Sequence, residues 1–98
     1  MRRDEVLKIL REQRDRLAAF SVRSLAIFGS VARGEAAPSS DVDVLVEFDP
    51  DKAVGLLAFI GLKQYLEEIL GSPVDLVTLQ ALRGRMRDRI LKEAIHAA

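Results

Sequence analysis

The chain has 98 residues, which is enough for one domain with one hydrophobic core and too few for two. Apolar residues make up 49% of the sequence, so a packed core is expected and a disordered chain is not. The 15 basic and 15 acidic residues cancel, and the missing basic excess argues against a protein that coats nucleic acid. The absence of cysteine excludes disulfides and thiolate metal sites.

Two features of the sequence concern the cellular compartment of the protein. The N-terminal ten residues mix acidic and basic side chains into their apolar pattern, which is not typical of a signal peptide. No apolar run is long enough to span a bilayer. We therefore expect a cytoplasmic protein without a membrane partner, in which residues 1–98 form a single domain.

Apolar spacing predicts elements in the order α-β-β-α-β-α. The predicted helices cover residues 4–20, 53–70 and 82–96, and the predicted strands cover residues 25–28, 42–48 and 74–77. A short helical turn can start at Ser30, residues 34–40 form a loop, and Asp49-Pro50-Asp51 forms a turn that starts the second helix. We expect an α/β (α+β) fold, with a small mixed β-sheet flanked by helices that lie on one side of it.

The first candidate for chemistry is Gly29-Ser30, directly after the first predicted strand. Glycine lets the backbone approach a ligand closely because it has no Cβ atom. The amides that follow make an anion site if a helical turn begins there, and Ser30 adds a hydroxyl donor. The expected ligand of this turn is a phosphate.

The second candidate is the segment Ser40-Asp41-Val42-Asp43-Val44. Residues two apart on a strand point to the same face, so Asp41 and Asp43 project side by side while the valines turn into the core. Two carboxylates this close repel each other unless a cation lies between them. Oxygen ligands of this kind suit Mg²⁺, which also takes phosphate oxygens.

The third candidate is Asp75, an isolated charge within the apolar strand 74–77. A buried strand does not normally carry such a charge. If this strand pairs beside the second one, Asp75 joins the other two aspartates. Two metal ions would then clamp an in-line displacement at phosphorus.

The stretch from Ile27 to Glu35, followed by the stretch from Ser40 to Phe48, resembles the DNA polymerase β-type nucleotidyltransferase superfamily. Within it, the chain resembles the minimal nucleotidyltransferase family, whose members are antitoxins encoded beside HEPN-type ribonuclease toxins. The family pattern is Gly-Ser, a spacer of about ten residues, Asp-x-Asp and a distant third carboxylate. All of these elements are present, and the resemblance covers nearly the whole chain.

The resemblance implies a polymerase β-like palm fold and a set of roles. Asp41 and Asp43 would bind both of two Mg²⁺ ions, and Asp75 would bind the catalytic ion and help to activate the nucleophile. Gly29 and Ser30 would hold the triphosphate tail of the nucleotide. The implied activity is transfer of AMP from ATP to a tyrosine of the partner toxin, which silences the toxin.

Two interpretations stay open for Arg33, which can contact phosphate oxygens or brace the loop by pairing with Glu35 or Asp41. Glu47 can share the face of Asp43, although a solvated charge at a strand end is the more common case.

A basic cluster follows Asp75 on the predicted last helix, formed by Arg83, Arg85, Arg87 and Arg89. These arginines can meet the nucleotide, an RNA or an acidic partner. A solvated helix face, balanced by Asp88 and Glu93, is the interpretation that such patterns favour.

Larger polymerase-like transferases add a helical domain that presents the acceptor, and no such domain fits into this length. We therefore expect a protein partner, and no nucleic-acid polymer as the routine acceptor. Two alternatives remain: an antitoxin that masks its partner without catalysis, and a nucleotidyltransferase of the aminoglycoside-modifying type that acts on a small molecule.

Overall fold

The computed structural model describes residues 2–37 and 39–98 and places four strands among five α-helices and one 3-10 turn within those ranges. The elements are α1 (Arg3–Glu12), α2 (Arg14–Ala18), β1 (Val22–Phe28), α3 (Gly29–Arg33), β2 (Val42–Phe48), α4 (Leu56–Leu70), β3 (Val74–Thr78), the 3-10 turn η1 (Leu79–Ala81), α5 (Gly84–Glu93) and β4 (Ile95–His96). None of the helices in these ranges has both the length and the apolar character needed to cross a membrane.

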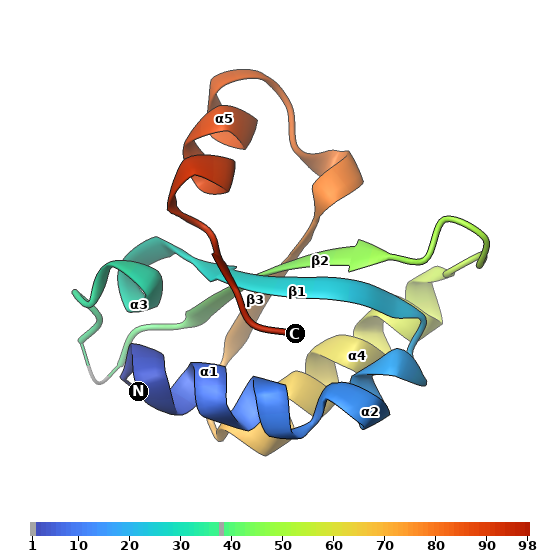
Figure 1. Cartoon of the computed structure of the whole chain (residues 1–98), viewed down its shortest axis with the longest axis horizontal. Coiled ribbons are helices and arrows are strands. Elements are labelled where there is room, and N and C mark those ends of the chain that lie inside the picture. The colour runs from blue at the N-terminus through green and yellow to red at the C-terminus, as the bar shows by residue number, and fades with distance from the viewer. Residues whose placement is uncertain (1, 38) are drawn as a thin grey trace.

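The strands form one sheet in the order β3-β2-β1-β4 (Figure 1). β1 runs antiparallel to both of its neighbours, whereas β2 and β3 run parallel. The return to a parallel neighbour requires a crossover, which α4 provides. The predicted mixed sheet flanked by helices is therefore confirmed.

Helices α1, α2 and α4 cover one face of the sheet, the lower face in Figure 1. The alternating residues Val42, Val44 and Val46 of β2 point to this face and are at most 1% exposed. They pack with Leu10 of α1 and Leu66 of α4 in the main apolar core. The pleat of the strand thus sends every second residue of β2 into this core.

Helix α5 lies on the opposite face of the sheet, which contradicts the expectation that all helices share one side (Figure 1). A second, smaller apolar cluster forms there from Phe28, Leu45, Leu82 and Ile90. The physical reason is the same alternation, because Phe28 and Leu45 turn apolar side chains to this face and need cover.

The predicted last helix over 82–96 is wrong at both ends. Helix α5 starts at Gly84, so Arg83 precedes it, and after Glu93 the chain becomes extended and forms β4. The Ala97 N–H donates a 2.8 Å hydrogen bond to the Leu25 carbonyl of β1. Pairing with the free edge of β1 therefore outweighs the helical tendency of the C-terminal segment.

The other predicted helices also differ from the structure. The helix predicted over 4–20 is interrupted at Gln13, whose side-chain oxygen accepts a 2.8 Å hydrogen bond from the Tyr65 hydroxyl of α4. The helix predicted over 53–70 begins at Leu56, and its first turn is not buried, since Leu56 is 73% exposed.

Candidate active site

Two of the three predicted aspartates lie side by side. Asp43 of β2 and Asp75 of β3 are register partners on neighbouring parallel strands, so their side chains point to the same face of the sheet. That face is the one covered by α5, because Leu45, two residues after Asp43, belongs to the small cluster under α5. Asp43 is half-buried and Asp75 is exposed.

Asp41 lies just before β2 begins, and it is exposed. Burial raises the pKa of the Asp43 carboxyl above its ordinary value, and the negative charges of Asp75 and then Asp41 raise it further. The charges of Asp75 and Asp41 therefore both act on the Asp43 carboxyl. In residues 2–37 and 39–98, however, no three His, Cys, Asp or Glu side chains are already gathered closely enough to hold a metal ion.

Gly29 lies against the carboxylate of Asp43. Its φ angle is +70°, in the left-handed region, and a Cβ atom at this position would overlap the Oδ2 oxygen of Asp43. Both observations require a residue without a side chain here. The glycine of the predicted Gly-Ser turn and the second aspartate of the predicted Asp-x-Asp pair are thus in direct contact.

Ser30 follows Gly29 in the short helix α3 and is half-buried. Its carbonyl oxygen accepts a 2.9 Å hydrogen bond from the Glu35 N–H, which closes the loop after α3. Neither Ser30 nor Asp41 lines the cleft described below.

Arg33 pairs with two carboxylates. Its Nε lies 3.1 Å from Oε2 of Glu35, the contact named in the bracing interpretation, and its Nη1 lies 3.0 Å from Oε2 of Glu93. Glu93 also accepts a 3.0 Å hydrogen bond from the Gly29 N–H, which lowers the pKa of the Glu93 carboxyl. Sequence reasoning missed this role of Glu93 and treated it as a balancing charge on a helix. No local pattern reveals a contact that spans 64 positions.

A cleft of about 410 Å³ separates α5 from the sheet beside the two aspartates. Its polar wall contains Gly29, Arg33, Asp43, Asp75, Arg89 and Glu93. Its apolar wall contains Phe28, Val77, Leu82, Met86 and Ile90. The carboxylates that border it are oxygen donors, a set that suits Mg²⁺.

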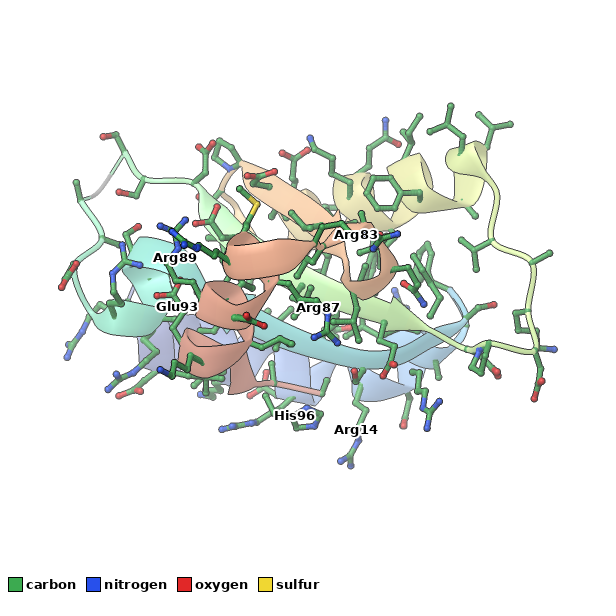
Figure 2. The ribbon with its side chains drawn as sticks, turned by 90° about the horizontal axis from the view of Figure 1, so that it is seen from above. Arg14, Arg83, Arg87, Arg89, Glu93 and His96 are labelled. Atoms are coloured by element: carbon green, nitrogen blue, oxygen red, sulfur yellow. The ribbon has the colours of Figure 1, made fainter. Side chains whose placement is uncertain are left out.

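The predicted basic cluster divides in the structure. Figure 2 shows Arg89 and Glu93 pointing to the α3 side of α5, whereas Arg83 and Arg87 point away from it. Of these arginines, Arg89 alone lines the cleft. The Arg83 guanidinium donates to the carbonyls of Gln80 and Leu82 and so closes the turn before α5. Glu47 lies outside the cleft and accepts a 3.5 Å hydrogen bond from Ser24 Oγ.

The sequence and the structure both match known proteins. Residues 4–96 match the family model of the nucleotidyltransferase domain. The chain is 40% identical over 94 residues to the protein adenylyltransferase MntA of Thermococcus cleftensis, and the match covers 95% of this chain and 93% of that protein.

Two solved structures share the fold. One, assigned as a minimal nucleotidyltransferase, has 37% sequence identity and a TM-score of 0.82, and the match covers 97% of this chain and 95% of that one. The other is a chain from the complex of a tri-AMPylated HEPN toxin of Shewanella oneidensis with its MNT antitoxin. It has a TM-score of 0.65 at 19% identity, covers 94% of this chain and 71% of that one, and therefore supports the fold alone. From the match of residues 4–96 and the relatives that align along nearly its whole length, the chain belongs to the nucleotidyltransferase domain family, as one of its minimal members.

Proposed function

We propose that this protein is a Mg²⁺-dependent adenylyltransferase of the cytoplasm that transfers AMP from ATP to a tyrosine of a HEPN-type ribonuclease toxin. It would act as the antitoxin of that toxin. The similarity to a protein adenylyltransferase and to a chain from a HEPN–MNT complex supports this proposal. The observation that carries it is the pairing of Asp43 with Asp75 beside Gly29, at the wall of a cleft.

Each predicted site residue receives a role in this proposal. Asp41, Asp43 and Asp75 would hold two Mg²⁺ ions, and Gly29, Ser30 and Arg33 would bind the triphosphate. When bound, the ions supply positive charge that offsets the charge on the phosphate oxygens during transfer. Asp43 of β2 and Asp75 of β3 already lie in register on one face of the sheet, and Asp41 lies one residue before β2 begins.

The reaction is a displacement at the α-phosphorus of ATP. The tyrosine oxygen forms a bond to the α-phosphorus, and the bond from that phosphorus to the oxygen bridging the α- and β-phosphates breaks. Pyrophosphate leaves with the electron pair of that bond. The tyrosine proton passes to the carboxylate of Asp75, which acts as the general base. The products are the AMP ester of tyrosine and pyrophosphate.

The reaction can be tested with purified protein, the partner toxin, Mg²⁺ and ATP labelled at either the α- or the γ-phosphate. We expect label on the toxin from the α-position and none from the γ-position. Asp75→Asn should slow labelling by about 10²–10⁴-fold, as expected for loss of a general base. Asp15→Asn makes the same chemical change on α2, on the other face of the sheet, and should leave labelling intact.

Other outcomes would replace the proposal. A toxin that is silenced without label from either position would show a masking antitoxin. Label that reaches an added aminoglycoside and not the toxin would show a small-molecule transferase.

A further inference from the structure

Both ends of α3 are held by one side chain from the far end of the chain. Oε1 of Glu93 accepts the Gly29 N–H at 3.0 Å, and Oε2 of the same carboxylate accepts Nη1 of Arg33 at 3.0 Å. Gly29 is the first residue of α3 and Arg33 is the last. The Glu93 side chain is only 22% exposed, so these contacts are partly shielded from water.

Glu93 has little freedom to move. It is the last residue of α5, and β4 begins two residues later. Within β4, Ile95 pairs with Ile27 of β1, and Ile27 itself lies two residues before Gly29. Figure 2 shows the Glu93 side chain directed from α5 toward α3. The carboxylate is thus fixed relative to the turn that it contacts.

The two contacts of Arg33 orient its guanidinium. Nε is paired with Glu35 and Nη1 with Glu93, and a planar group held at two of its nitrogens has a defined plane. Among residues 2–37 and 39–98, Nη2 of Arg33 has neither a hydrogen-bond nor an ion-pair partner. Its N–H groups are therefore available to a ligand such as a phosphate.

The bond to Gly29 acts on the other end of α3. It fixes the amide of Gly29, which lies so close to the Asp43 carboxylate that a Cβ atom would not fit between them. The same hydrogen bond lowers the pKa of Glu93 below its ordinary value of 4.5, so the carboxylate is ionised at neutral pH.

We propose that Glu93 is a positioning residue, which holds the Gly29–Ser30 turn and aims Arg33 so that the turn binds the phosphate tail of the nucleotide. The ligand in this statement rests on the proposed function. Glu93 itself does not contact the nucleotide. A carboxylate at this place also repels a triphosphate, and if it merely competed with phosphate for the same donors, its removal would strengthen binding. The sign of the change in affinity therefore separates positioning from competition.

The test is calorimetric binding of ATP with Mg²⁺ to wild type, Glu93→Ala, Glu93→Gln and Arg33→Gln. We expect Glu93→Ala to weaken binding by about 10–100-fold, the range typical of residues that orient a ligand-binding group. Glu93→Gln should have a smaller effect of the same sign, because its oxygen still accepts from Gly29 while the ion pair with Arg33 is lost. The Glu93→Gln variant also keeps the test valid if Glu93→Ala does not fold.

The route of action is tested by a double-mutant cycle. Because Glu93 acts partly through Arg33, the variant with both Arg33→Gln and Glu93→Gln should bind ATP about as weakly as Arg33→Gln alone. A merely structural role would give additive losses.

A matched control exists on the opposite face of the sheet. Glu67 of α4 accepts the Val74 N–H at 3.0 Å and pairs with Lys63 at 3.3 Å, so it makes the same two kinds of contact as Glu93. Glu67→Gln should lower thermal stability as Glu93→Gln does and leave ATP affinity unchanged.

A second readout needs no nucleotide. In amide NMR spectra of the free protein, Glu93→Ala should shift the Gly29 and Ser30 signals and speed hydrogen exchange at Gly29, whereas Glu67→Gln should not. Tighter ATP binding by either Glu93 variant, or unchanged affinity with unchanged amide signals, would overturn the positioning role. A wild-type protein that binds no ATP would contradict the proposed function instead, and the amide signals would still show whether Glu93 holds the turn.

Discussion

The two faces of the sheet are covered very differently, and the difference explains where chemistry is possible. Three helices cover one face and bury Val42, Val44 and Val46 of β2. On the other face, α5 covers only a four-residue apolar cluster and leaves a cleft beside Asp43 and Asp75. Charged side chains are tolerated on the thinly covered face because water can reach them. Strand β2 thus turns apolar side chains into the core on one side and the Asp43 carboxylate toward the cleft on the other.

The largest expected difference between the two faces is the loss of stability when one leucine on each face is truncated to alanine. Leu66 is fully buried in the large core, and Leu66→Ala should cost about 2–5 kcal/mol of unfolding free energy. Leu82 lies at the wall of the cleft in the small cluster, so water can enter the space that Leu82→Ala leaves, and the cost should fall at or below the lower limit of that range. Urea denaturation of both variants measures the difference. Equal losses would mean that the two clusters are equally well packed.

Two glycines at the ends of α3 separate backbone strain from steric contact. Gly29 has a φ angle of +70° and Gly34 one of +74°. A Cβ atom added at Gly29 would overlap Asp43, whereas one added at Gly34 would have no atom within 4 Å. Each alanine variant should lose about 1–2 kcal/mol from the left-handed backbone. Gly29→Ala should lose more, and it should also lose ATP binding. Thermal unfolding and calorimetry with ATP test this, and equal behaviour of the two variants would argue against the close approach of Gly29 to Asp43.

The arginines of α5 sharpen the comparison within the thin face. Arg89 lines the cleft and Arg87 does not. We predict that Arg89→Gln weakens ATP binding by about 1.5 kcal/mol, the scale of a hydrogen bond to a charged group, because the variant removes a cation from the wall of the cleft proposed to bind the phosphates. Arg87→Gln makes the same change on the same helix and should have no effect. Titration calorimetry on the pair checks this, and similar losses in both would indicate a general effect of net charge.

The smallest effect concerns the pH dependence of stability. Burial and the nearby carboxylates raise the pKa of Asp43 above 3.8, so the folded state binds this proton more tightly than the unfolded state does. Its contribution to stability is therefore greatest below pH 3.8 and is lost as the pH rises through the folded-state pKa. Asp43→Asn should be slightly more stable than wild type at pH 7 in EDTA, and the difference should vanish near pH 3.8.

Added Mg²⁺ should reverse this order, because binding to the folded wild type stabilises it and the variant has lost a charged ligand. Melting temperatures at both pH values, with and without Mg²⁺, are the measurement. A variant that is less stable than wild type at pH 7 in EDTA would show that the Asp43 carboxylate makes stabilising contacts.

Local patterns in the sequence were sufficient for the centre of the site. The alternation of Val42, Asp43 and Val44 predicts a strand with a carboxylate on one face, and Asp75 in an apolar run predicts its partner on the next strand. The structure places these two in register. Gly29 after a buried strand predicts the turn, although not its contact with Asp43.

The placement of α5, β4 and Glu93 could not be predicted from local patterns, because it depends on how the chain folds back onto the sheet. Helix α5 covers the side of the sheet to which β2 turns Leu45, an apolar side chain that needs burial. Strand β4 forms because one edge of β1 would otherwise be unpaired. Neither is visible in the periodicity of residues 82–96. The role of Glu93 follows from both, since α5 and β4 together bring it to Gly29 and Arg33. Contacts of this kind require the assembled sheet.

Under the proposed function, the thinly covered face of the sheet catalyses transfer of AMP. Its most direct test is coexpression of the HEPN toxin with wild type, Asp75→Asn or the control Asp15→Asn, followed by growth measurement and intact-mass spectrometry of the toxin. Wild type and Asp15→Asn should protect the cells and add the mass of one or more AMP units to the toxin. Asp75→Asn should still copurify with the toxin but slow transfer by about 10²–10⁴-fold, as expected for loss of a general base, and should fail to protect. Full protection by Asp75→Asn, with no mass added to the toxin in any sample, would contradict the claim.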